Sequence, residues 1–225
     1  NLGLCYYALG NYDAAIKKFS QSILLNTSKS EIYYNLGLAY NQINAYKQAL
    51  EAFSKCIKLD SYNGSAHYEI ANLYKLIFEN ELAITHYRKA KKTINTPDLN
   101  LKLGLLYFEN TEYQNSIEPL KEYILQNMND WEILYIYGQA LIKTNRYPEA
   151  IDIYSRLIDE FPDEMNYYYD LAESYYNLSD YNNALENYKK VLIFDEENYT
   201  VLFKIGTLHN QLNQFYAAEQ YLQEA

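Results

Sequence analysis

The sequence repeats itself about every 34 residues, and this period restricts the chain to a repeat architecture. The clearest copy spans residues 30–63, SEIYYNLGLAYNQINAYKQALEAFSKCIKLDSYN. Counting Ser30 as position 1, apolar, aromatic or small side chains occupy positions 4, 7, 8 and 11, and then positions 17, 20, 24 and 27. Spacings of three and four residues are typical of one face of a helix. Each copy is therefore predicted to form two amphipathic helices, A and B, separated by a short polar connection.

About seven copies account for the whole chain. The predicted copies are residues 1–29 (partial), 30–63, 64–96, 97–130, 131–164, 165–198 and 199–225 (partial). One residue is lost near Thr96-Pro97, where a proline can shorten the connection between helices. Because no linker or shift of composition interrupts the pattern, we expect a single array over residues 1–225. Both ends fall inside a copy, so bare end helices are a possible route to self-association.

Two columns of small residues run through all copies. Position 8 is always glycine or alanine, and position 20 is always alanine or serine; in the second copy these are Gly37 and Ala49. Small side chains let two helices approach closely, so helices A and B are predicted to cross at these columns. The larger side chains then fill the space around the crossing, and stability comes from stacking neighbouring copies.

The motif L-G-x-x-Y, followed at a fixed offset by Y-x-x-A-x-x-x-F, resembles the tetratricopeptide repeat (TPR) family. In the second copy the first half of the motif begins at Leu36 and the second half at Tyr46. The resemblance covers the entire chain. It implies an all-α fold: a right-handed α-solenoid of stacked antiparallel helix pairs, or TPR superhelix, with helix A on the inner, concave surface. It also implies a non-catalytic scaffold or adaptor that binds a peptide or a partner helix in that groove.

The candidate partner-binding residues lie on the expected inner face of helix A. Position 5 is aromatic in most copies, and tyrosines offer a large contact area with a polar tip. Polar side chains at positions 6, 9 and 12 lie beside this column. In a second interpretation the rings shield the backbone and the polar residues form a solvated helix face. The candidates are Tyr34, Asn35, Tyr68, Asn72, Lys75, Lys102, Tyr135, Gln139, Tyr169, Glu173 and Tyr176.

Two specialised grooves of the family are not supported by these columns. The chaperone-tail clamp requires lysine at position 5, and no copy has one there. The asparagine ladder of the O-GlcNAc transferase superhelix requires asparagine repeated at position 6. Here that column reads Asn1, Asn35, Glu69, Lys102, Ile136, Asp170 and Lys204.

Charge and composition narrow the class of partner. The formal net charge is -10, with 19 basic against 29 acidic residues, which argues against nucleic acid and favours a protein or peptide partner that is basic. No apolar run approaches the length of a membrane span, and the first residues lack the basic flank of a signal peptide. Cys5 and Cys56 are interpreted as buried free thiols. We expect a cytoplasmic location, with the periplasm and other compartments left open.

Nothing in the sequence predicts catalysis. HExxH, GxSxG, P-loop and GxGxxG motifs are absent, so no catalytic, cofactor-binding or metal site is assigned and no cofactor is expected. His67, His86 and His209 are interpreted as packed or surface histidines. The alternative function is a targeting or regulatory arm of a larger enzyme, such as a glycosyltransferase, kinase or protease, whose catalytic domain lies outside this segment. A third possibility is self-assembly of the copies of one chain on those of another.

Overall fold

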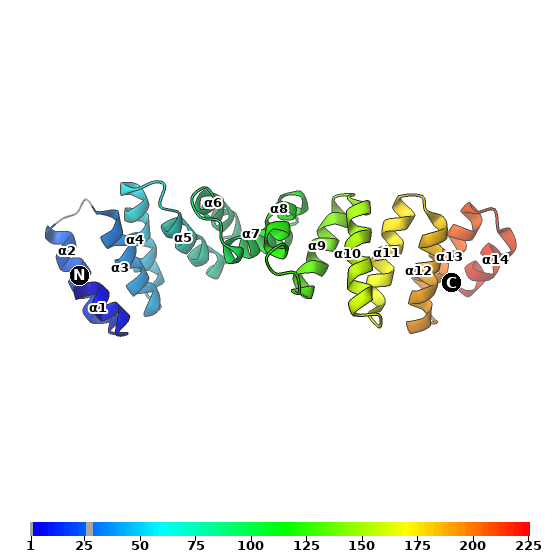
Figure 1. Ribbon diagram of the computed structural model, residues 1–225, viewed down its shortest axis with the longest axis horizontal. Coiled ribbons are helices and arrows are strands. Elements are labelled where there is room, and N and C mark those ends of the chain that lie inside the picture. Colours follow the sequence, from blue (N-terminus) through cyan, green and yellow to red (C-terminus); the bar gives the residue numbers. More distant parts are fainter. Residues whose placement is uncertain (1, 26–28) are drawn as a thin grey trace. The chain divides into compact units, whose positions relative to one another are not determined.

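The computed structural model describes residues 2–25 and 29–225, and every regular element within them is an α-helix (Figure 1). The all-α prediction is confirmed. Helices A begin at residues 30, 64, 97, 131, 165 and 199, where the copies were predicted to begin. The helices are α1 Leu2–Ala8, α2 Tyr12–Leu25, α3 Ser30–Gln42, α4 Tyr46–Leu59, α5 Gly64–Leu76, α6 Asn80–Lys91, α7 Pro97–Glu109, α8 Tyr113–Ile124, α9 Trp131–Lys143, α10 Tyr147–Glu160, α11 Met165–Asn177, α12 Tyr181–Phe194, α13 Tyr199–Gln211 and α14 Phe215–Glu224.

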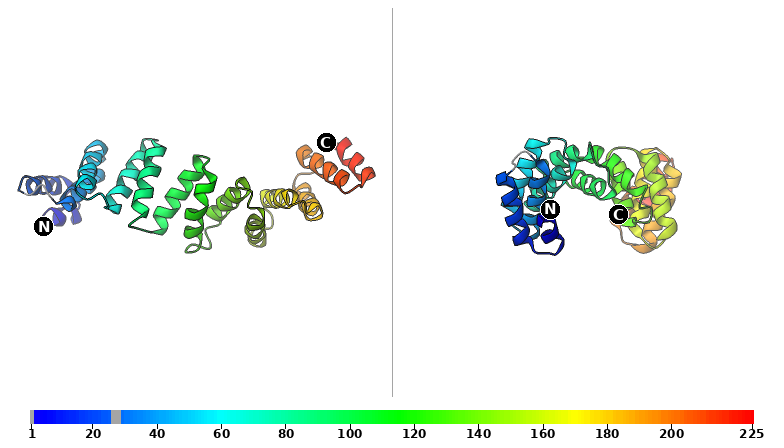
Figure 2. Two further views of the ribbon diagram at one scale, coloured as in Figure 1. Left: turned by 90° about the horizontal axis from the view of Figure 1, so that it is seen from above. Right: turned by 60° about the vertical axis from the view of Figure 1, so that its left-hand side comes forward.

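The chain forms two compact units. The first, residues 1–110, contains α1–α7, and the second, residues 111–225, contains α8–α14. Within each unit, consecutive helices run antiparallel and stack in chain order, as an α-solenoid requires (Figure 1, Figure 2). The boundary lies between helices A and B of the copy at residues 97–130. The expectation of one array over residues 1–225 stays a prediction.

The predicted crossing of helices A and B is confirmed. All residues at positions 8 and 20 that the structure describes are buried, among them Ala49, which is 0% exposed. A Cβ atom built on Gly37 would lie 2.6 Å from ring atoms of Phe53, at position 24 of the same copy. The glycine therefore allows α3 to approach the aromatic ring of α4 at van der Waals contact.

Each turn from helix A to helix B places one residue in the left-handed region. This residue is at position 15, with φ between +57° and +73°. A left-handed residue just after a helix lets the following backbone N–H groups donate hydrogen bonds to the last carbonyl groups of the helix. Glycine and asparagine adopt this conformation most readily. The residues at this position are Gly10, Asn44, Phe78, Thr111, Asn145, Ser179 and Asn213.

The cysteine prediction is half right. Both thiols are free, and Cys56 is buried, which raises its pKa to about 11. Cys5, however, is exposed. It occupies position 10 of its copy, and in the second copy the residue at this position, Ala39, is buried against Ala15 and Phe19 of the preceding copy.

Candidate functional site

A four-residue arrangement recurs on the face of helix A in both units. It consists of positions 5 and 9 of one helix A, position 24 of its helix B, and position 6 of the next helix A. We call this surface the helix A face. The three complete examples are the Lys102 site (Tyr68, Asn72, Tyr87, Lys102), the Asp170 site (Tyr135, Gln139, Tyr154, Asp170) and the Lys204 site (Tyr169, Glu173, Tyr188, Lys204).

The two tyrosines of each site pack against one another. Their ring centroids are 5.8 Å apart for Tyr68 and Tyr87, 6.0 Å for Tyr135 and Tyr154, and 5.8 Å for Tyr169 and Tyr188. The position 24 ring is buried in all three sites, whereas the position 5 ring is partly exposed. Each partly exposed ring is therefore held in place by a buried one, and part of its surface stays accessible to a partner.

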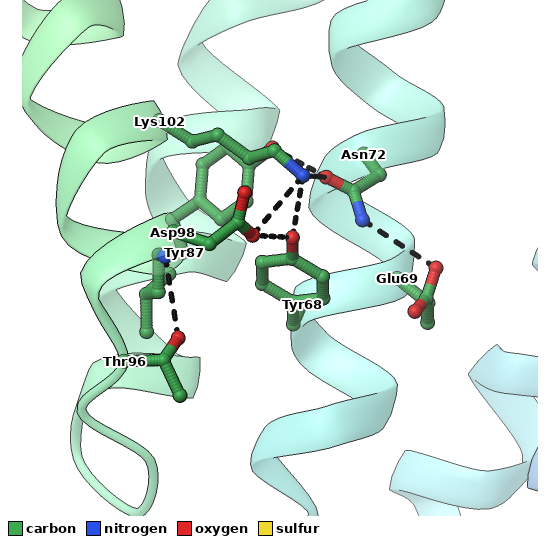
Figure 3. A network of polar contacts seen from close by, with 8 residues as sticks. Tyr68, Glu69, Asn72, Tyr87, Thr96, Asp98 and Lys102 are labelled. Carbon is green, nitrogen blue, oxygen red and sulfur yellow. Dashed lines mark hydrogen bonds and ion pairs between the residues drawn. The ribbon is translucent and has the colours of Figure 1, made fainter.

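In the Lys102 site, an ammonium group lies among polar partners from α5 and α7 (Figure 3). The Nζ atom of Lys102 lies 3.3 Å from Oδ1 of Asn72 and 3.3 Å from Oδ2 of Asp98, and it donates to the Tyr68 hydroxyl. It also lies 4.7 Å from the Tyr68 ring centroid. Burial lowers the pKa of Lys102, but Tyr68 and Asp98 outweigh that effect and the pKa is raised. The Tyr87 hydroxyl donates to Asn72 Oδ1 at 2.7 Å.

The Lys204 site holds an ammonium group in the same way. The Nζ atom of Lys204 lies 2.6 Å from Oε1 of Glu173, and the Tyr188 hydroxyl donates to that same oxygen. The centroids of three tyrosine rings lie 5.8–5.9 Å from the ammonium nitrogen, a distance at which cation–π attraction acts. These rings belong to Tyr169, Tyr176 and Tyr188.

The Asp170 site has the same pair of packed tyrosines, at positions 5 and 24, but it carries a carboxylate at position 6 where the other two sites carry a lysine. The Tyr154 side chain is 0% exposed. Its hydroxyl and Oδ2 of Asp170 are both buried, and neither has a partner at hydrogen-bonding geometry among the described residues. Burial raises the pKa of Asp170, opposed by the neighbouring hydroxyls of Tyr154 and Tyr135 and by the charge of Lys143. Burial and the Asp170 charge raise the pKa of Tyr135 to about 12.

The predicted candidates separate into groups. Lys75 lies 3.8 Å from Glu109 in an exposed pair, Tyr34 packs on Phe53, and Asn35 lines a separate pocket of about 590 Å³ beside α1 and α2. The other candidates belong to the three sites or, for Tyr176, lie beside one. Sequence reasoning left out Asp98, the position 24 tyrosines, Asp170 and Lys204 as site members. The constant offset between position 5 and the next position 6 would have identified the last two.

In residues 2–25 and 29–225, no group of three or more His, Cys, Asp or Glu side chains could hold a metal ion. The Nδ1 atoms of His67 and His86 lie 2.9 Å apart, and His67 Nε2 lies 3.2 Å from the Ser61 carbonyl oxygen, so these two histidines are packed against one another. None of the described helices is both long and apolar enough to cross a membrane.

Three family models for tetratricopeptide repeats match the chain. They cover residues 3–44, 30–63 and 169–225, which together exceed half of the sequence. A further model, for subunit 3 of the anaphase-promoting complex or cyclosome, matches residues 78–157. The matched segments overlap the predicted copies and lie in both compact units.

Among curated proteins, the chain is 34% identical over 91 residues to the peroxisomal targeting signal receptor of Candida glabrata, covering 40% of this chain. It is 29% identical over 143 residues to the BBSome complex member BBS4 of Bos taurus, covering 63% of this chain. The alignments span only 15% and 28% of those two relatives.

Among solved structures, YrrB, a TPR protein, aligns over 82% of this chain and 95% of its own, with a TM-score of 0.62 and 22% identity. MamA from Desulfovibrio magneticus RS-1 aligns over 72% of this chain and 92% of its own, with a TM-score of 0.58 and 16% identity. At these identities the two structures show a shared fold. The matching family models, together with the 34-residue period and the paired helices, establish that this chain belongs to the tetratricopeptide repeat family.

Proposed function

We propose that the chain is a non-catalytic protein-interaction scaffold that binds an extended peptide on the helix A face of its units. The observation that carries this proposal is the recurrence of half-exposed tyrosines at position 5, each fixed by a buried ring. Rigid, partly exposed aromatic rings beside charged groups are typical of binding hot spots, because they lose little conformational entropy on binding.

The relatives support an interaction role. One is called a receptor for the peroxisomal targeting signal, another a member of a protein complex, and YrrB is described as having an unusual peptide-binding site. The net charge of -10 favours a partner with basic residues. The exposed free thiol of Cys5 is compatible with a reducing compartment such as the cytoplasm.

Binding to defined peptides tests the proposal. Short random-sequence peptides would be selected on the chain by display, and the affinity of the best would be measured by calorimetry. Replacing Tyr34, Tyr68, Tyr135 and Tyr169 together by alanine should weaken binding by about tenfold or more, since each contributes contact area. The matched control is Tyr216→Ala in α14, because this tyrosine is 77% exposed and lies on a helix B.

Thermal melting of each variant would show that the fold is retained. The proposal requires the four-tyrosine variant to lose affinity while Tyr216→Ala keeps it. Selected peptides that bind the four-tyrosine variant as tightly as the original chain would refute binding at the helix A face. Failure to select any peptide would refute peptide binding altogether.

A further inference from the structure

We propose that the Asp170 site binds the positively charged end of a lysine or arginine side chain supplied by the partner peptide. This inference rests on the proposed function, since it names a chemical requirement of a peptide bound on the helix A face. It concerns residues of the second compact unit alone.

The argument starts from the equivalence of two neighbouring sites. Each member of the Asp170 site lies 34 residues before its counterpart in the Lys204 site: Tyr135 before Tyr169, Gln139 before Glu173, Tyr154 before Tyr188, and Asp170 before Lys204. The ring separations also agree, at 6.0 Å and 5.8 Å. The two sites are therefore the same structural frame with different charges.

The Lys204 site shows which chemical group this frame accommodates. Its ammonium lies 2.6 Å from a carboxylate oxygen and 5.8 Å from the centroids of both frame tyrosines, Tyr169 and Tyr188. The Lys102 site in the first unit repeats the arrangement, with Nζ 4.7 Å from the Tyr68 centroid. In both cases the chain's own lysine supplies the cation.

The Asp170 site has the anion and the rings but no internal lysine among them. The buried Oδ2 of Asp170 and the buried Tyr154 hydroxyl have no hydrogen-bond partner among the described residues. A buried polar group without a partner is destabilising, because it has lost its hydrogen bonds to water. Of the charged groups that act on the pKa of Asp170, Lys143 lowers it and Glu173 raises it, and Glu173 is already paired with Lys204. An incoming cation would therefore meet a carboxylate that the Tyr154 and Tyr135 hydroxyls face but that forms no ion pair among the described residues.

A cationic side chain fits this environment better than other ligands. An ammonium has three donors and a guanidinium five, so either can bond the carboxylate and a phenol oxygen together. Its aliphatic stem can lie along the half-exposed rings of Tyr135 and Tyr167, whose centroids are 5.3 Å apart. A metal ion is disfavoured, because one carboxylate with phenols is a poor ligand set and no three-ligand group exists in the described residues.

A double-mutant cycle with a display-selected basic peptide tests the inference. Each lysine of the peptide would be replaced by norleucine and each arginine by citrulline, and each peptide would be titrated against the original chain and Asp170→Asn. At one position of the peptide, the replacement should weaken binding to the original chain by about tenfold or more, but should weaken binding to Asp170→Asn by less than about twofold. Whether norleucine or citrulline gives this result identifies the cation.

The matched control is Glu186→Gln, which removes one exposed negative charge from helix B. The inference would be overturned if replacing the basic residue weakened binding to Asp170→Asn as much as binding to the original chain. It would also be overturned if Glu186→Gln abolished the effect of the replacement to the same extent as Asp170→Asn. The proposed function would stand in that case, because the peptide would still bind the helix A face. Loss of the proposed function would instead appear as unchanged binding to the four-tyrosine variant.

A second variant keeps the test valid if Asp170→Asn does not fold. Asp170→Lys places a lysine where the neighbouring site has Lys204, and the introduced ammonium would fill the site while facing Gln139, the counterpart of Glu173. The expected result is a melting temperature near that of the original chain and at least about tenfold weaker binding of the basic peptide. Undiminished binding by a folded Asp170→Lys chain would overturn the inference.

Discussion

Lys204 of α13 and Glu173 of α11 form an ion pair of 2.6 Å between two successive helices A. Both side chains are mostly buried, at 29% and 23% exposure, and the Glu173 oxygen also accepts from Tyr188. The pair therefore links neighbouring copies through a desolvated contact rather than a surface one. Such a link should contribute to stacking in the second unit.

Replacing Lys204 by methionine should lower the free energy of unfolding by about 1–2 kcal/mol, because Glu173 would lose its countercharge while remaining largely buried. Urea unfolding followed by circular dichroism measures the change. The control is Lys75→Met, whose pair with Glu109 spans 3.8 Å at 38% and 51% exposure and should matter little. Equal effects of the two substitutions would contradict this account of the Lys204 site.

Ala49→Leu should destabilise the first unit by about 1–3 kcal/mol, because Ala49 is 0% exposed and lies at the crossing of α3 and α4. Ser54→Leu, at an exposed position of the same helix, introduces a similar side chain without overpacking. Thermal melting of both variants gives the comparison. A melting temperature of Ala49→Leu as high as that of Ser54→Leu would show that the crossing is not close-packed.

Phe78→Asn should stabilise the chain by about 1 kcal/mol. Phe78 has φ of +62° and is 89% exposed, so its ring gains little from packing while its backbone adopts a conformation that bulky residues rarely occupy. Asn44, Asn145 and Asn213 hold the equivalent position. Ile77→Asn is the control, since the backbone there has φ of -102° and no strain to relieve. An unchanged or lowered melting temperature of Phe78→Asn would refute the prediction.

The His67–His86 pair should make the chain less stable as the pH is lowered below neutral. Burial lowers the pKa of both histidines, and together with the charges of His67 and Lys89 it brings that of His86 to about 4. The unfolded chain then binds protons below about pH 6.5 that the folded chain does not, so stability present at neutral pH is lost toward pH 4. Ser61 and Asp60 act in the opposite direction on His67, and the ring of Tyr74 packs on His86.

His86→Gln removes one titrating group and leaves a polar partner for His67. Between about pH 7 and pH 5, the original chain should lose about 1 kcal/mol more than this variant, after allowance for solvent screening. The difference between the two chains is the relevant quantity, because burial raises the pKa of Glu69 and Asp170 and gives them the opposite pH dependence. Parallel curves of unfolding free energy against pH would contradict this role of the pair.

The fold could be predicted from the 34-residue repeat, because helix starts and the columns of small residues are local features that recur in register. Ala49 and Gly37 were placed correctly for that reason. The sites were harder to predict, since each joins residues of two copies: Lys204 meets Glu173 only after two copies stack. Phe78 shows another limit. Its own preference opposes the left-handed conformation, which the turn between α5 and α6 imposes.

Photo-crosslinking tests the central claim, binding of a peptide at the helix A face, most directly. Benzoylphenylalanine would replace Tyr135 on α9 or, as the control, Asp152 on the exposed side of α10, and each chain would be irradiated with a display-selected peptide. The account predicts strong crosslinking from position 135 and little from position 152. Crosslinks formed mainly from position 152 would contradict it.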